Sequence, residues 1–136
     1  MTQGTYTLLV EVTSETQVEV GALGERQFPV GTYAYTGSAF GPGGFTRLDR
    51  HREVAAGDRA VRHWHVDYLL GADATRVVGD VRTAGRDVEC AVARRLAESF
   101  PPVSEFGASD CGCDSHLVVG ADEAAVRGAH AAVRDA

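Results

Sequence analysis

An aromatic strand, a glycine-rich turn and a cationic helix follow one another in residues 31–54, GTYAYTGSAFGPGGFTRLDRHREV. Alternation along a strand predicts that Tyr35 faces the same side of a sheet as the tyrosine two residues before it. The glycines in residues 37–44 suit a turn whose backbone can approach a phosphate closely. The helix that follows should hold Arg47 and His51 on one face. This order is typical of a phosphate-handling site, and also of a hairpin turn followed by a solvated helix.

A carboxylate with the chemistry of a metal ligand is Glu89, on a helix predicted over residues 86–100 and opened by Asp87. The buried stripe of that helix is expected to comprise Val88, Ala91, Val92 and Leu96. Glu89 lies next to this stripe, so its carboxylate should point along the sheet and need an arginine or a metal as its partner. The alternative is a surface glutamate that pairs with Arg86 or Arg94.

A compact C-x-C-x2-H array near the C-terminus consists of Cys111, Cys113 and His116. Zinc takes four ligands in a tetrahedron, so this array supplies three and the fourth has to come from elsewhere in the chain. The alternatives are a buried turn satisfied by its own hydroxyls and thiols, or polar residues that line the cleft of the tyrosines. The cysteines number three, and an odd number argues against a disulfide framework.

The order of the elements predicts an α/β (α+β) fold in a single domain, residues 1–136, with a central, mainly antiparallel sheet and helices on its faces. Strands are predicted over residues 4–12, 17–20, 26–30, 31–36, 76–83 and 115–119. Helices are predicted after residue 44, within 62–71, and over 86–100 and 122–133. The first four strands are expected to form one meander, which places Tyr6 in the first strand near Tyr35.

The composition is acidic and contains no lysine, isoleucine or asparagine. All 13 basic side chains are arginines, and the net charge is −6. These features predict a GC-rich genome and a salt-adapted organism, and an acidic protein is a poor nonspecific binder of nucleic acid. Residues 47–65 nevertheless gather arginines and histidines into a local cationic patch. The chain shows neither a signal peptide nor a membrane span, so we expect a cytoplasmic protein without a membrane partner.

The motifs together resemble the GIY-YIG nuclease superfamily. Residues 4–6, GTY, are similar to its first motif, and residues 35–37, YTG, to its second. Arg47 and His51 follow at the spacing of the helix arginine and histidine of that superfamily, and Glu89 resembles its metal-binding glutamate. The segments GTYAYTGSA, HWHVDYLL and SDCGCDSHL are similar to an uncharacterised branch found in archaea and some bacteria, alone or attached to a DNA glycosylase of the endonuclease III type.

Two departures from that pattern concern the motif spacing and the end of the domain. An extra strand pair separates the two tyrosine motifs of this chain. The superfamily commonly has an asparagine near its end, and this chain has none. The corresponding role is therefore vacant or belongs to Ser109, Asp110 or His116.

The resemblance implies a metal-dependent endonuclease that hydrolyses phosphodiester bonds in DNA, in repair or in the processing of structured DNA. Glu89 would hold Mg²⁺ or Mn²⁺, Arg47 would bind nonbridging oxygens, and Tyr6 with Tyr35 would orient or deprotonate the water, with His51 as a second proton carrier. The expected substrate contacts are Gly37, Ser38, Arg50, His65, Ser109 and His116. The expected partners are DNA and a repair glycosylase. The alternatives are a noncatalytic nucleic-acid or protein interaction module and a zinc-stabilised structural domain.

Overall fold

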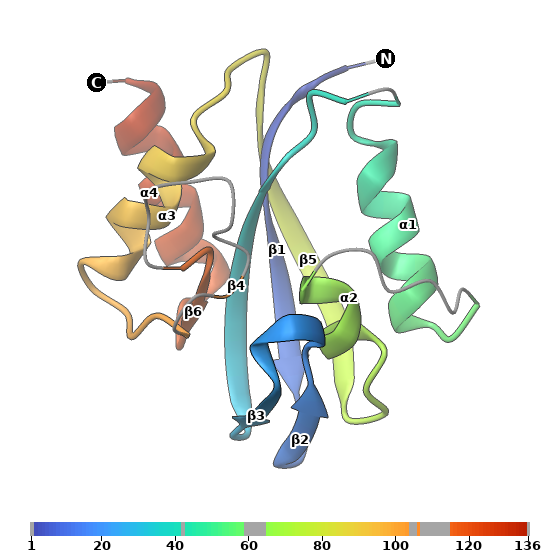
Figure 1. Cartoon of the computed structure of the whole chain (residues 1–136). Helices are drawn as coiled ribbons and strands as arrows, with labels where there is room; N and C mark the ends of the chain where they lie inside the picture. The colour runs from blue at the N-terminus through green and yellow to red at the C-terminus, as the bar shows by residue number, and fades with distance from the viewer. Residues whose placement is uncertain (1, 42, 59–64, 104–105, 107–114, 136) are drawn as a thin grey trace.

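A computed structural model describes residues 2–41, 43–58, 65–103, 106 and 115–135. Its centre is a four-stranded sheet in the order β5-β1-β4-β6, in which all neighbours are antiparallel (Figure 1). The strands of this sheet are β1 Gly4–Val12, β4 Gly31–Ser38, β5 Thr75–Ala84 and β6 Leu117–Val119. A second sheet pairs β2 Thr16–Glu19 with β3 Glu25–Phe28, joined by a 3-10 turn at Gly21–Leu23.

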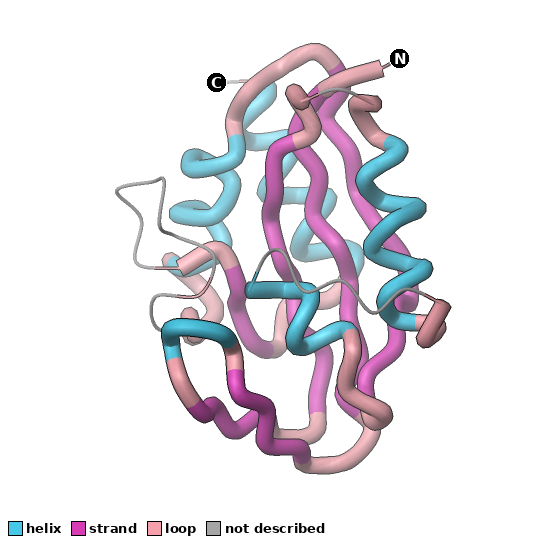
Figure 2. The backbone as a smooth tube through the Cα atoms, turned by 45° about the vertical axis from the view of Figure 1, so that its right-hand side comes forward, coloured by secondary structure: helices cyan, strands magenta, loops and turns pink. Residues whose placement is uncertain are grey.

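Helices cover both faces of the four-stranded sheet, two on each side (Figures 1 and 2). Helices α1 Thr46–Ala55 and α2 His65–Leu70 pack on one face. Helices α3 Glu89–Ala97 and α4 Glu123–Arg134 pack against each other and on the opposite face. The protein is therefore an α+β fold with a mainly antiparallel sheet, as the sequence predicted. Among the described helices, none has the length and apolarity needed to cross a membrane.

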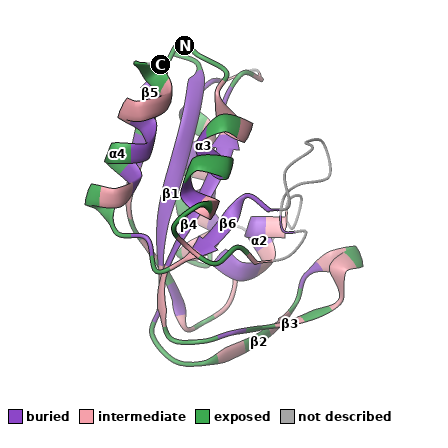
Figure 3. Ribbon diagram, turned by 90° about the vertical axis from the view of Figure 1, so that its left-hand side faces the viewer, coloured by how far each residue is buried: buried purple, intermediate pink, exposed green. Residues whose placement is uncertain are grey.

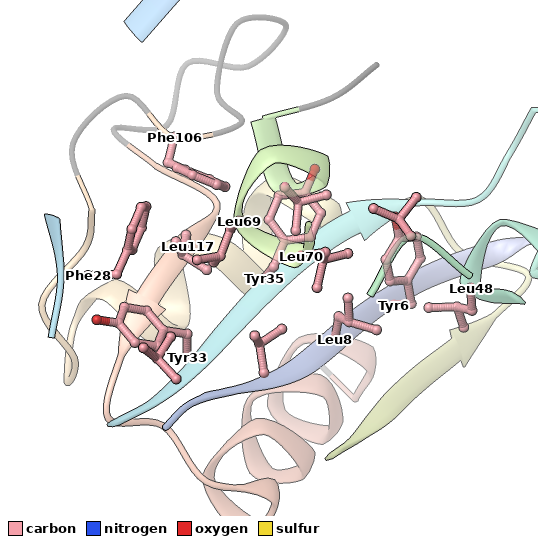
Figure 4. Close-up of a cluster of buried hydrophobic side chains, with 14 of the residues drawn as sticks. Tyr6, Leu8, Phe28, Tyr33, Tyr35, Leu48, Leu69, Leu70, Phe106 and Leu117 are labelled. Atoms are coloured by element: carbon pink, nitrogen blue, oxygen red, sulfur yellow. The ribbon is translucent and has the colours of Figure 1, made fainter. Parts of the chain in front are cut away.

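Strand β1 lies at the centre of the core, because nearly all of its residues pair with β4 on one side and with β5 on the other. Its even-numbered side chains, from Tyr6 to Val12, join Tyr33 and Tyr35 of β4 in the cluster beneath α1 and α2 (Figure 4). Its odd-numbered Leu9 joins the cluster beneath α3 and α4. The side chains of β1 therefore divide between the two faces of the sheet, and β1 is buried over nearly all of its length (Figure 3).

The predicted four-stranded meander is wrong. Strands β2 and β3 pair only with each other and form a separate hairpin, while β4 returns directly beside β1. The side chains of this short hairpin alternate between exposed and partly buried, apart from Phe28, so most of it has no apolar face to bury in the main sheet. Phe28, the last residue of β3, and Val20, which follows β2, still join the buried cluster beneath α1 and α2.

Helix α3 is shorter than the predicted 86–100 and is not opened by Asp87. The Thr5 hydroxyl donates to the Arg86 carbonyl and accepts from the Val88 amide, each at 2.9 Å. These two backbone groups are therefore tied to β1, and the helix begins after them at Glu89. Val92 and Leu96 are buried as expected, but Ala93 takes the place of the predicted Ala91, which is exposed.

Candidate functional site

The centre of the candidate site is a buried hydrogen bond between β1 and α1. The Tyr6 hydroxyl lies 2.7 Å from Nε2 of His51, and both side chains are almost fully buried. The two residues meet because Tyr6 stands opposite Gly37 in the β1–β4 register. A Cβ atom at position 37 would lie 2.5 Å from the Tyr6 oxygen, so glycine there makes room for the phenol. Tyr35 approaches the same imidazole, with its ring centroid 6.4 Å from that of His51.

The second ring nitrogen of His51 faces a buried carboxylate on α2. His51 Nδ1 lies 3.7 Å from Oδ1 of Asp67, and Nη2 of Arg50 lies 3.5 Å from the other oxygen of the same carboxylate. Because an ionised carboxylate only accepts hydrogen bonds, it favours the imidazole tautomer with its proton on Nδ1. Nε2 is then an acceptor, and the Tyr6 hydroxyl donates to it. Tyr6, His51 and Asp67 therefore stand in the order phenol–imidazole–carboxylate, joined by one hydrogen bond and by one 3.7 Å contact that exceeds hydrogen-bond distance; we call this group the phenol–imidazole–carboxylate chain.

The glycine-rich turn holds Arg47 beside these tyrosines. A guanidinium nitrogen of Arg47 donates to the carbonyl of Ser38, the last residue of β4. The other nitrogen, Nη2, would lie 3.0 Å from a Cβ at Gly41, so the turn passes close over the guanidinium. The glycine-rich turn and the first turn of α1 therefore lie side by side in this structure.

Charged side chains from three helices act on the two buried tyrosines. Burial raises the pKa of Tyr6 well above its usual value, Tyr35, Glu89 and Asp67 raise it further, and Arg47 lowers it. The pKa of Tyr35 is raised in the same way, by burial first and then by Glu89 and Asp67. Both phenols are therefore neutral at ordinary pH, and side chains from β1, β4, α1, α2 and α3 interact within one site.

Glu89 lies in the first turn of α3, and its carboxylate raises the pKa values of both tyrosines. The pairing of β6 with β4 ends at Tyr35, whereas β4 continues to Ser38. The Glu89 carboxylate is 26% exposed, and its Oε2 lies 3.5 Å from Nδ1 of His116. One ligand atom each from Glu89, Cys90 and His116 lies within 4.8 Å of the others, a spacing that a metal ion could bridge.

Cys90 corrects the expectation drawn from the odd number of cysteines, because it is disulfide-bonded. A disulfide sulfur carries no thiolate and is not available as the anionic ligand that zinc prefers. Counting cysteines along a sequence could not detect this bond. In this state the metal-binding chemistry of the group comes from Glu89 and His116.

The remaining predicted residues divide into those near the site and those outside the described residues. His65 begins α2, its pKa is lowered by burial, and its ring packs edge-on against Phe106 at 5.7 Å. His65 is therefore placed against an aromatic ring next to the site. Ser109, Asp110, Cys111 and Cys113 lie outside the described residues, and the zinc array that includes two of them stays a prediction.

Asp67 was not among the predicted site residues, although the sequence carried a signal for it. It is a lone carboxylate between apolar residues in HVDYLL, the whole of α2, and it is fully buried. A carboxylate on the buried side of a helix requires a cation or a hydrogen-bond donor. Its partners, Arg50 and His51, lie on the preceding helix, so sequence spacing alone could not identify them.

Comparison of the chain with curated proteins and with solved structures finds no match. A protein-family model described as "Domain of unknown function DUF123" matches residues 5–135. The match covers every residue of the site, from Tyr6 on the first strand to His116 before the last one. The chain therefore belongs to the DUF123 family.

Proposed function

We propose that this protein is a metal-dependent endonuclease of the GIY-YIG type that hydrolyses phosphodiester bonds in DNA. The observation that carries the proposal is the convergence of Tyr6 from β1, Arg47 and His51 from α1 and Glu89 from α3 on one site. Phosphodiester hydrolysis requires an acceptor for the proton of the attacking water, a cation for the phosphoryl oxygens and help for the leaving oxygen. The motif resemblance in the sequence assigns the same residues to these tasks.

Proton transfer is the task of the phenol–imidazole–carboxylate chain. Because burial raises the pKa of Tyr6, a free phenolate is unfavourable. The Tyr6 oxygen can accept the proton of the water as its own proton passes to Nε2 of His51, 2.7 Å away. The Asp67 carboxylate then stabilises the imidazolium that forms. The water is activated in this way without a long-lived phenolate.

Arg47 is the group that meets the phosphate. Its guanidinium rests on the neutral Ser38 carbonyl. A phosphate oxygen is a stronger acceptor because it is charged, so the arginine can exchange one partner for the other when DNA binds. Loss of one such donor typically lowers a rate by about 10²–10³-fold.

Glu89 and His116 fit a divalent cation, because a carboxylate oxygen and a buried imidazole nitrogen face each other at 3.5 Å. A metal bound there, such as Mg²⁺ or Mn²⁺, would supply Lewis acidity for the leaving oxygen. The Glu89 carboxylate also raises the pKa values of both tyrosines, so the residue that would hold the metal acts on the same phenols.

A panel of nicked, branched, abasic and single-stranded DNA tests the proposal, in Mg²⁺ or Mn²⁺ and at molar salt. Wild-type protein should cut at least one substrate, and Glu89→Gln and Arg47→Ala should each cut it at least 100-fold more slowly while remaining folded. Glu123→Gln is the matched control, since this exposed glutamate pairs with Arg127 on α4. Near-normal cleavage by either site variant would refute the assignment.

A noncatalytic interaction module on the same fold is the second candidate. Two observations favour it. Tyr6 and Tyr35 are 2% and 6% exposed, so little of either phenol can meet a substrate. The net charge of the chain is −6, which does not favour a close approach to DNA. Such a module would retain the same buried network for stability and would bind DNA or protein without cutting. The same panel separates the two functions, because a module shifts the mobility of a labelled DNA and yields no product.

A further inference from the structure

His116 is a buried histidine whose ring nitrogens are not satisfied within the described part of the chain. Its side chain is 2% exposed, and neither Nδ1 nor Nε2 makes a hydrogen bond of normal geometry with a described residue. Burial lowers the pKa of His116, and the backbone of Thr36 raises it, with burial the larger effect. A neutral imidazole left in this way is costly unless something binds it.

The neighbour of His116 is the carboxylate of Glu89, and the distance between them fits a shared cation. Oε2 and Nδ1 are 3.5 Å apart, which exceeds a normal N–H···O hydrogen bond. Two ligand atoms that each lie about 2.1 Å from one metal, at angles between octahedral and tetrahedral, are separated by roughly 3.0–3.5 Å. The pair therefore has the spacing of two ligands of one ion.

The donor types decide which ions the pair prefers. Mg²⁺ prefers oxygen ligands and retains its waters, whereas imidazole suits zinc and other late first-row metals. Cys90 lies within reach of the same position, but its sulfur is held in a disulfide. Among the described residues, the ligand atoms available in this state are one carboxylate oxygen and one imidazole nitrogen.

We propose that Glu89 and His116 form a mixed oxygen–nitrogen site that binds late first-row divalent cations, such as Co²⁺ and Zn²⁺, more tightly than Mg²⁺. This inference rests on the proposed function for the role of the bound metal in DNA cleavage, and it assigns His116 as a second protein ligand. His116 directly precedes β6, and its backbone carbonyl accepts from the Thr36 amide of β4, so the site lies beside β4. The preferred metal of the enzyme would then be a transition metal.

Binding of Co²⁺ and of Mg²⁺ to protein without DNA tests this site by titration calorimetry. Wild-type protein should bind Co²⁺ at least tenfold more tightly than Mg²⁺. His116→Asn should weaken Co²⁺ binding at least tenfold and change Mg²⁺ binding less than twofold, whereas Glu89→Gln should weaken both. His65→Gln is the control for a histidine that lies near the site and faces Phe106. Equal Co²⁺ affinity in wild-type protein and His116→Asn would overturn the proposal.

A second measurement needs no variant and so does not depend on the folding of one. In protein labelled with ¹⁵N-histidine, Zn²⁺ should shift the Nδ1 resonance of His116 and leave that of His130 unchanged. A titration in which the His116 resonance does not move would overturn the site. Because neither measurement uses DNA, cobalt binding through His116 without cleavage refutes the nuclease alone. Cleavage with Mg²⁺ and no metal contact at His116 refutes this inference alone.

Discussion

Two buried histidines lie on opposite faces of the same sheet and have different partners. On the α4 face, His130 lies between two neutral hydroxyls, 2.8 Å from Oγ1 of Thr7 and 2.8 Å from Oγ1 of Thr83. On the α1 face, His51 lies between the Tyr6 phenol and the Asp67 carboxylate. The two side chains are 2% and 1% exposed, so burial does not distinguish them.

The difference in partners separates a structural histidine from one that can carry a proton. A neutral imidazole satisfies two hydroxyls, one as donor and one as acceptor, and burial lowers the pKa of His130 to about 4. Protonation would require the donating hydroxyl to rotate and accept instead, and it would bury a positive charge that Arg134 also disfavours. At His51 a carboxylate faces Nδ1, so a proton accepted at Nε2 forms an ion pair. The surroundings of each ring, more than its depth, decide whether it can take part in proton transfer.

The largest expected effect comes from replacing each histidine by glutamine. His51→Gln should lower the rate of DNA cleavage by about 10²–10⁴-fold, the usual contribution of a general acid–base group. His130→Gln should leave the rate within a few-fold and lower the free energy of unfolding by about 1–3 kcal/mol, because Thr7 or Thr83 loses its partner. Single-turnover cleavage and urea unfolding measure the two effects. Equal rate losses in both variants would show that His51 and His130 do not differ in their role in cleavage.

Asp67→Asn tests whether the carboxylate is what makes His51 different. The amide keeps the size of the side chain and removes its charge, so the imidazolium loses its partner 3.7 Å away. We expect a rate loss of about 10²-fold or more, together with a changed pH profile of cleavage. Asp80→Asn is the matched control, because Asp80, on β5, pairs with Arg82 of the same strand and with Arg52 of α1. A pH profile identical to that of the wild type would assign Asp67 a purely structural role.

Part of the candidate site could be predicted from sequence because it follows from the periodicity of a single strand or helix. Alternation along β4 placed Tyr35 on the same side as Tyr33, and a helix spacing of four placed Arg47 near His51. These are properties of a strand or a helix taken alone, whereas the expected nearness of Tyr6 to Tyr35 rested on the meander and comes instead from the direct β1–β4 pairing. The fold class followed in the same way from the order of strands and helices.

The features missed by sequence reasoning depend on pairing between distant segments. The His130 network joins α4 to Thr7 and Thr83 on two strands, and the Asp67 contact joins two helices. The disulfide of Cys90 and the separate β2–β3 hairpin are of the same kind. Each requires a register or a packing direction, and a pattern of residue types along one segment does not specify either.

The pH dependence of stability should reveal His130. Above about pH 6.5 both the folded and the unfolded forms of this histidine are neutral, so its contribution to stability is fully present. Between pH 6.5 and about 4 the unfolded chain binds a proton that the folded chain does not, and stability falls as the pH falls. The loss should reach up to about 3 kcal/mol. Urea unfolding at pH 7 and pH 4.5 measures it.

His65 and His116 also have pKa values lowered by burial and contribute to the same loss. His130→Gln therefore serves as the reference, because the difference between its pH dependence and that of the wild type isolates one residue. An identical slope of stability against pH in the two proteins would contradict the assignment of His130 as a neutral, structural histidine.

The smallest effects should come from adding one methyl group on each face. In Gly37→Ala the new Cβ would lie 2.5 Å from the Tyr6 oxygen and 2.6 Å from Cζ, so the phenol has to move away from His51. We expect a loss of about 1–3 kcal/mol in stability and slower cleavage. Gly128→Ala, on the exposed side of α4, meets nothing within 4 Å and should stabilise the protein by about 0.5–1 kcal/mol without changing cleavage. If Gly37→Ala cleaves DNA at the wild-type rate, the Tyr6–His51 hydrogen bond is not part of the reaction.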